Sequence, residues 1–175
     1  SNMKKIITTL FAAIAICSSA QENESFHIHE HGQNEIGLSF GPSYSFEHNE
    51  WKASAHLHYF RSIKPESKWA LGGSLESVFG EGQHYNVSAG VKYTPIPHIH
   101  VAIMPGVNFT KENHNHTEEL AEAHHNQFKA AFAVHGEIVA DLLIIGKFHV
   151  GPTLDFSWSK GHTHIMPGLH TAYSF

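Results

Sequence analysis

Residues 114–125, with the sequence HNHTEELAEAHH, have a composition typical of a metal-binding segment. Four histidines and three glutamates lie within these twelve residues. Neutral imidazole suits Zn²⁺, Cu²⁺ and Ni²⁺, and carboxylates are common further ligands. A histidine-rich tract with carboxylates is therefore a compositional signal for a metal site. The expected ligands are His114, His116, Glu118, Glu122, His124 and His125.

A second histidine-rich stretch, HIHEH, adds His27, His29 and His31 near the start of the chain. Altogether 18 of the 175 residues are histidine, and pairs separated by one residue recur. On a β-strand, residues i and i+2 share a face, so such a pair can bind one ion. His98 and His100 form a pair of this kind and are further candidate ligands. The alternative is that the histidines form a polar network without a metal.

The first 20 residues are interpreted as a cloning remnant followed by a secretory signal peptide. Two lysines precede the short apolar run IITTLFAAIAIC, and small residues follow it. This order is typical of a cleaved signal. The only cysteine, Cys17, lies within it, so the mature chain is expected to contain no disulfide and no thiolate metal site.

The rest of the chain is expected to form β-strands. After a histidine-rich arm at 21–34, apolar and polar residues alternate in eight segments: 35–46, 51–60, 68–79, 84–94, 98–109, 127–140, 146–158 and 163–175. Period-two alternation is typical of strands with one apolar face. An even number of strands of this length favours an all-β fold, an eight-stranded antiparallel up-and-down transmembrane β-barrel over residues 35–175. Four prolines fall within the segments, where we expect bulges or bends.

Aromatic residues distinguish this fold from a soluble lipocalin-like barrel. On the apolar face they gather near the strand ends, and aliphatic residues dominate the middle. Two aromatic girdles around an apolar band are typical of a barrel in a bilayer. The longest polar connection, 110–126, is then extracellular and the arm periplasmic, so the two cannot share a metal site. The connection LLII at 142–145 is expected to be a short periplasmic turn.

In strand number, girdles and the terminal sequence LHTAYSF, the chain resembles small outer-membrane barrels of the OmpA/OmpX/OmpW-like type. The resemblance implies a location in the outer membrane of a Gram-negative bacterium, in contact with its lipid. It also implies that the barrel-insertion machinery recognises the last strand.

The functional hypothesis is non-enzymatic binding of a transition-metal ion, Zn²⁺ first and Cu²⁺ or Ni²⁺ next. The external loop would capture or buffer ions, with a metal-uptake or efflux system as a conceivable partner. The formal net charge of −5 argues against nucleic acid as a partner. Inward-facing acids are expected to pair with lysines, Glu137 with Lys147 and Asp155 with Lys129, if the interior is only a polar network.

Two alternatives remain open. Serine, histidine and acidic residues near the outer leaflet would suit a lipid-modifying enzyme, although no G-x-S-x-G motif marks a nucleophile; these are Ser77, Ser157, Ser159, His84, His162, Glu76 and Asp155. A pH-responsive surface barrel is the other alternative, because protonation of the histidines would reverse the sign of the net charge.

Overall fold

The computed structural model describes residues 32–80, 83–111 and 128–175. The predicted signal peptide, most of the arm at 21–34 and nearly all of the loop at 110–126 lie outside these residues. The strands are β1 (Asn34–Ser45), β2 (Glu50–Ser62), β3 (Trp69–Phe79), β4 (His84–Ile96), β5 (Ile99–Lys111), β6 (Phe128–Ala140), β7 (Leu143–Ile145), β8 (Phe148–Ser159) and β9 (His162–Ser174). The described part of the chain contains no helix long and apolar enough to cross a membrane.

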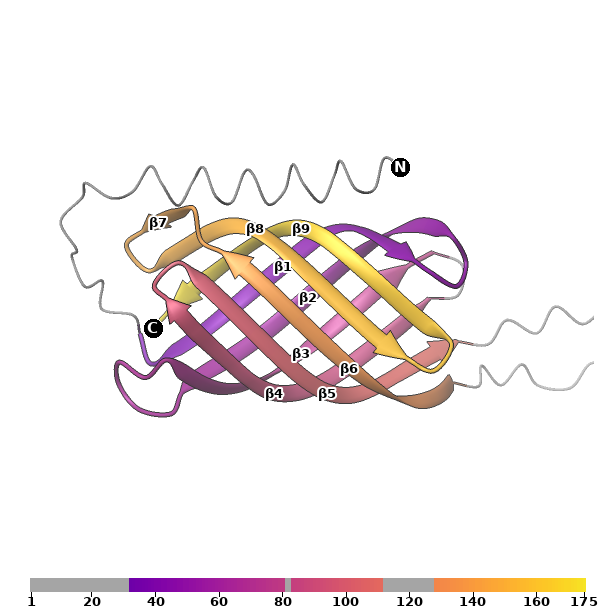
Figure 1. Cartoon of the computed structure of the whole chain (residues 1–175), viewed down its shortest axis with the longest axis horizontal. Helices are drawn as coiled ribbons and strands as arrows, with labels where there is room; N and C mark the ends of the chain where they lie inside the picture. Colours follow the sequence, from indigo (N-terminus) through magenta and orange to yellow (C-terminus); the bar gives the residue numbers. More distant parts are fainter. Residues whose placement is uncertain (1–31, 81–82, 112–127) are drawn as a thin grey trace, which may run out of the picture. The chain divides into compact units, whose positions relative to one another are not determined.

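The eight long strands close into an antiparallel barrel (Figure 1). Each pairs with its neighbours along the chain, β6 pairs with β8, and β1 pairs with β9 to complete the cylinder. The predicted fold class is therefore confirmed. We call the end where β1 begins and β9 finishes the C-terminal end, and the opposite end the loop end.

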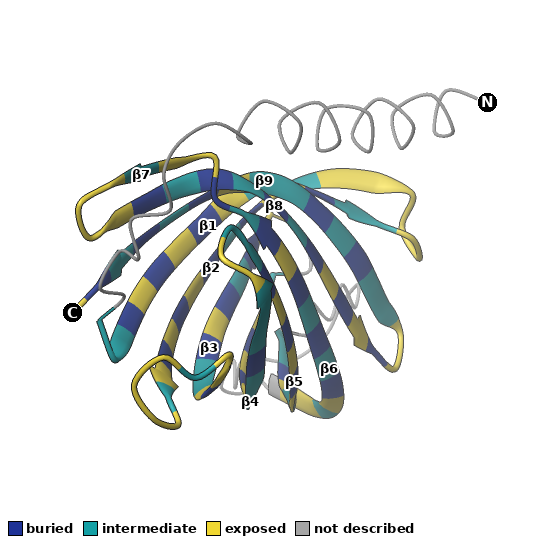
Figure 2. Cartoon of the chain, turned by 60° about the vertical axis from the view of Figure 1, so that its left-hand side comes forward, coloured by how far each residue is buried: buried dark blue, intermediate teal, exposed yellow. Residues whose placement is uncertain are grey.

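Burial alternates along every long strand, as Figure 2 shows by its striped ribbons. The exposed stripe is apolar and includes Leu38, Leu57, Leu75 and Ile103. Aromatic residues flank it, with Tyr44 against Trp51 near the loop end and Trp69 against Tyr93 near the C-terminal end. An outward apolar face between aromatic girdles is the surface that a bilayer stabilises.

The connection between β6 and β8 differs from the predicted short turn. Leu143–Ile145 forms the strand β7, which folds back in a hairpin onto Val150, His149 and Phe148 of β8. β8 therefore changes partner along its length, from β7 at the C-terminal end to β6 from Thr153 onward. A Cβ atom at Gly151 would overlap the backbone oxygen of Ala140, so glycine permits the close crossing at this change of partner.

Pro42, Pro105 and Pro167 lie in gaps of a strand ladder that keeps its register on both sides, so none of these three forms the bulge that was one expectation. The β1–β9 pairing stops at Phe40 with Leu169 and resumes in the same register at Tyr44 with Ile165, leaving Pro42 and Pro167 in the gap. On its other side Pro42 pairs normally with Ala53. Each residue of an antiparallel strand forms its backbone hydrogen bonds with one neighbouring strand only. A proline, which has no backbone N–H, is therefore tolerated where the pairing with that neighbour is interrupted.

Gly37 makes room for two of the interior histidines. A Cβ atom built on Gly37 would overlap His58 Nε2 and lie 2.8 Å from His170 Nε2. Both rings are buried and stack against one another, with their centroids 5.1 Å apart. The absent side chain of Gly37 therefore helps to fit two imidazoles across a narrow barrel.

Gly37→Ala is expected to lower the free energy of unfolding by about 1–3 kcal/mol, because the added methyl group overpacks the interior. The matched control is Gly136→Ala, whose Cβ would have no neighbour nearer than 3.9 Å. Urea unfolding of both variants in detergent measures the difference. Equal stability of the two variants would contradict the packing role of Gly37.

Candidate functional site

The interior of the barrel is filled by histidines and acidic residues. Inward positions repeat every two residues along a strand, so the pair His56 and His58 places both rings inside. The buried members are His56, His58, His84, His100, His135, His149, His164, His170, Glu35, Glu76, Glu137, Asp141 and Asp155. Eight strands enclose a space just wide enough for side chains, so these groups must contact one another.

Five residues of β2, β6 and β8 meet midway along the barrel, and we call them the central cluster: His56, His58, His135, Glu137 and Asp155. His56 Nδ1 lies 3.6 Å from Asp155 Oδ2 and 3.9 Å from Glu137 Oε1. His58 Nδ1 lies 3.4 Å from Glu137 Oε2. The rings of His56 and His135 are 4.4 Å apart between centroids. The contacts cross the barrel from one wall to the other.

Polar atoms of the central cluster lack hydrogen bonds although they are buried. Both ring nitrogens of His56 and of His135 have no hydrogen-bond partner within the described residues, and neither has Asp155 Oδ2. Buried polar atoms in native proteins are nearly always satisfied by protein, water or an ion. Several unsatisfied nitrogen and oxygen atoms aimed at one another therefore indicate a place for a bound species.

Two overlapping ligand sets exist in the central cluster. His56, His135 and Asp155 form one set, and His56, His58 and Glu137 form the other; within each, the potential ligand atoms all lie within 4.8 Å of one another. Ligands on a tetrahedral Zn²⁺ at about 2.0–2.1 Å stand roughly 3.3 Å apart. A contraction of roughly an ångström or somewhat more would let either set hold one ion.

Toward the loop end, Glu76 connects the central cluster to a pocket. Its Oε1 atom lies 2.7 Å from His164 Nε2, and its Oε2 atom lies 3.5 Å from His135 Nδ1. Glu76 is buried and belongs to β3, whereas the two histidines come from β9 and β6. One carboxylate therefore orients two imidazoles from different walls.

Toward the C-terminal end, Asp141 is the centre of a third group. Its Oδ2 atom lies 2.6 Å from His100 Nε2 and 3.2 Å from His149 Nδ1. The three form a further possible ligand set, but here hydrogen bonds already join them. Burial opposes ionisation of Asp141, yet the two histidines outweigh it and hold the pKa of this carboxyl well below its usual range.

The outcome for the predicted ligands is mixed. His100 belongs to a ligand set, with Asp141 and His149, whereas His98 lies in the β4–β5 turn and belongs to none among the described residues. The other predicted ligands lie outside the described residues: His27, His29, His31, His114, His116, Glu118, Glu122, His124 and His125. Asp141 was missed, and its only signal is an acidic residue directly after a predicted strand.

The predicted acid–lysine pairs are wrong. Lys129 and Lys147 are exposed, whereas Glu137 and Asp155 are buried and face histidines. The interior ion pair that does involve a lysine joins Lys92 Nζ to Glu35 Oε1 at 2.6 Å. Histidines, and not the expected lysines, therefore contact the buried carboxylates of Glu137 and Asp155.

The serines proposed for an enzyme are not oriented by a histidine ring: Ser159 Oγ donates a hydrogen bond of 3.2 Å to the backbone oxygen of His162. Ser157 and Ser159 accept hydrogen bonds from Asn86 and Asn108 instead. A Ser–His–Asp connection exists at the opposite end, where Ser174 Oγ lies 3.2 Å from His149 Nε2 and His149 contacts Asp141. Ser174 is only 3% exposed and Asp141 is shared with His100, so this arrangement offers no open nucleophile.

Solved structures that resemble this barrel include two outer-membrane proteins. Ail, the attachment invasion locus protein of Yersinia pestis, aligns with a TM-score of 0.56 and 14% identity, over 83% of this chain and 99% of Ail. Neisserial surface protein A aligns with a TM-score of 0.60 and 8% identity, over 81% of this chain and 96% of its own. No family model matches the chain, and no curated protein matches it.

The likeness shows the fold. The chain has the architecture of a small outer-membrane β-barrel, as its strand pattern and aromatic girdles predict. The expected location in a bacterial outer membrane agrees with this architecture and with the apolar outer surface.

Asp141→Asn is expected to lower the free energy of unfolding by about 3–5 kcal/mol at pH 5, because two buried histidines lose the carboxylate that they contact. The folded-state pKa of Asp141 is depressed, so its contribution is present above the unfolded value of about 3.9 and is lost as the pH falls through the folded value. Urea unfolding should therefore give a smaller difference between wild type and variant at pH 3 than at pH 5.

The control for this prediction is Lys147→Gln in the same connection, where the side chain is exposed. Its stability should follow the wild type at both pH values. A difference for Asp141→Asn that stays constant from pH 5 to pH 3 would contradict the ionised, histidine-bound carboxyl.

Proposed function

We propose that this protein binds a transition-metal ion inside its barrel, Zn²⁺ first and Cu²⁺ or Ni²⁺ next. The observation that carries the proposal is the group of unsatisfied, buried ligand atoms in the central cluster. An ion placed among them would satisfy imidazole nitrogens and a carboxylate oxygen at once. These are the donor types that such ions prefer over water.

The side chains around the central cluster support the proposal that its ligands hold a metal ion. Thr153 Oγ1 donates a hydrogen bond of 2.7 Å to Asp155 Oδ1, which fixes the carboxylate and leaves Oδ2 toward the cluster. Ser39 Oγ donates a hydrogen bond of 3.4 Å to Glu137 Oε1. Hydrogen-bond partners behind the ligands orient them and raise their affinity for a metal.

The external loop and the arm keep their predicted role in this proposal. His114, His116, His124 and His125 on the loop, with Glu118 and Glu122, would capture or buffer ions outside. His27, His29 and His31 would do so on the periplasmic side. The interior would then hold the more strongly bound ion, because its ligands come from rigid strands. A role beside a metal-uptake or efflux system remains part of the hypothesis.

The test is a Zn²⁺ titration of the tag-free barrel, refolded in detergent, against a competing chelator. The loop and arm histidines are first replaced by asparagine, so that only the strands and short turns can bind. We expect this background to retain a site with a Kd below about a micromolar, roughly 8 kcal/mol of binding free energy. His56→Asn should abolish it, because His56 belongs to both ligand sets.

Asp155→Asn is the second variant and should weaken binding at least tenfold while it preserves the side-chain shape. Far-UV circular dichroism and the heat-modifiable mobility of the barrel on gels verify that each variant is folded. If the background binds no Zn²⁺ and only the intact loop or arm does, the interior site is refuted. If no form binds Zn²⁺, Cu²⁺ or Ni²⁺, the proposed function is refuted.

A further inference from the structure

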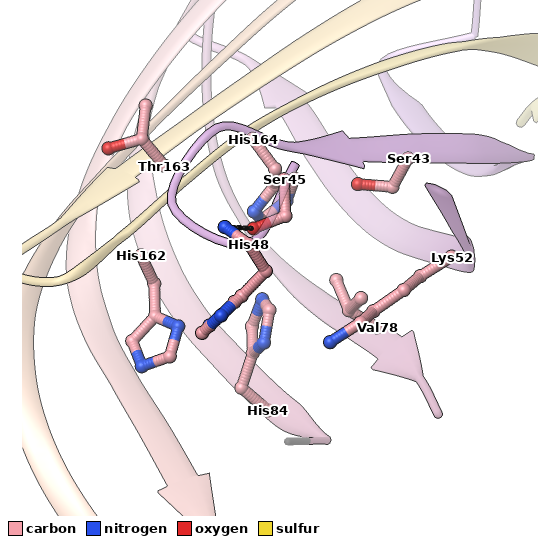
Figure 3. A pocket seen from close by; sticks show the side chains of 9 residues that line it. All are labelled: Ser43, Ser45, His48, Lys52, Val78, His84, His162, Thr163 and His164. Atoms are coloured by element: carbon pink, nitrogen blue, oxygen red, sulfur yellow. Dashed lines mark hydrogen bonds between the residues drawn. The ribbon is translucent and has the colours of Figure 1, made fainter. Parts of the chain in front are cut away.

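Four histidines line a pocket at the loop end of the barrel, apart from the central cluster. We call it the mouth pocket, and Figure 3 shows the side chains around it. His48 comes from the β1–β2 connection, His84 begins β4, and His162 and His164 lie at the start of β9. The wall is completed by Lys52, Val78 and the hydroxyl-bearing residues Ser43, Ser45 and Thr163.

The rings lie near one another, but the mouth histidines are not among the described groups whose ligand atoms all lie within 4.8 Å, so binding of one ion requires these side chains to move inward. The ring centroid of His84 lies 5.2 Å from that of His164 and 5.4 Å from that of His162. The centroid of His48 lies 6.0 Å from that of His162. For imidazoles on a tetrahedral Zn²⁺ with Zn–N near 2.0–2.1 Å, the centroids stand about 5 Å apart. His48 is the exposed member of the four, and its ring would have to turn toward the others to complete the set.

His164 is already oriented as a ligand. Its Nε2 atom lies 2.7 Å from Glu76 Oε1, which fixes the tautomer with the proton on Nε2. Its Nδ1 atom then carries the lone pair, and this buried atom has no hydrogen-bond partner in the described residues. His164 is only 3% exposed. A carboxylate behind a histidine is the usual second partner of a metal-binding imidazole.

The size of the pocket selects the ligand. The cavity measures about 10 Å³, which is about the space that one water molecule needs. A single metal ion with its ligands drawn inward fits this space. The ammonium group of Lys52 is a positive charge in the pocket wall and opposes the binding of a cation. Its Nζ atom lies 2.6 Å from Glu50 Oε1. On the other side, Glu47 accepts a hydrogen bond of 2.7 Å from the backbone nitrogen of Thr163.

We propose that the mouth pocket is a second transition-metal site, with His84, His162 and His164 as ligands and His48 as the fourth. It goes beyond the proposed interior site because its residues are different and it lies at the loop end. Glu76 joins the two, since one oxygen contacts His164 and the other faces His135 of the central cluster. The mouth pocket would thus bind an ion at the loop end of the barrel, and the Glu76 carboxylate would lie between this site and the central cluster.

The test is a Co²⁺ titration of the full chain, in the background that lacks the loop and arm histidines, followed by visible absorption. Four-coordinate Co²⁺ absorbs strongly, so the site is seen directly. His48→Asn with His162→Asn is expected to remove one binding event or weaken it at least tenfold. Lys160→Gln, an exposed change in the turn next to His162, should leave this event intact. Full retention in the double variant would overturn the proposal.

Two further variants distinguish a metal ion in the mouth pocket from the interior ion and from a bound anion. His56→Asn removes the interior site and should leave Co²⁺ binding in the mouth pocket unchanged. The two proposed sites can therefore be refuted independently of one another. Lys52→Met removes the ammonium from the wall and should tighten Co²⁺ binding. If Lys52→Met leaves Co²⁺ binding unchanged or weakens it, and sulfate competes with the ion, the pocket is an anion site and the proposal is wrong.

Discussion

The narrow interior of an eight-stranded barrel is the constraint on which the rest of this structure depends. It has room for side chains and little else, so an inward polar group must find its partner on a nearby strand or across the barrel. Histidine suits this task because one ring can donate at one nitrogen and accept at the other. A chain of hydrogen bonds, ring contacts and histidine–carboxylate contacts connects the loop end with the C-terminal end: His164, Glu76, His135, His56, Glu137, His58, His170 and Asp141.

The backbone leaves room for the polar side chains inside the barrel. Gly37 leaves space for two stacked rings, and Gly151 lets the end of β6 cross β8 closely enough to turn Asp141 inward. Asp141 then binds His100 and His149, which closes the polar chain at the C-terminal end. Where hydrogen bonds are complete, as around Asp141 Oδ2, the histidines stabilise the fold. Where they are incomplete, as in the central cluster and at His164 Nδ1, the same residue type leaves donor atoms for an ion.

Much of the fold could be predicted from the sequence, because alternation and girdle aromatics are local signals. The eight long strands follow from residues such as Ile36, Leu38 and Phe40, which share one face. The partners inside the barrel could not be predicted in this way. His56 pairs in register with Ser39 and Glu76 but meets His135 and Asp155 across the barrel, and such contacts depend on strand tilt. The hairpin of β7 and the inward turn of Asp141 likewise depend on packing that no short pattern encodes.

The most direct test of a metal site inside the barrel is a crystal structure of the zinc-soaked protein, with diffraction data collected above and below the zinc absorption edge. We expect an anomalous difference peak within about 2.0–2.2 Å of a His56 ring nitrogen and of an Asp155 or Glu137 carboxylate oxygen. Zinc bound only outside the barrel, with the central cluster bridged by water, would contradict the interior site.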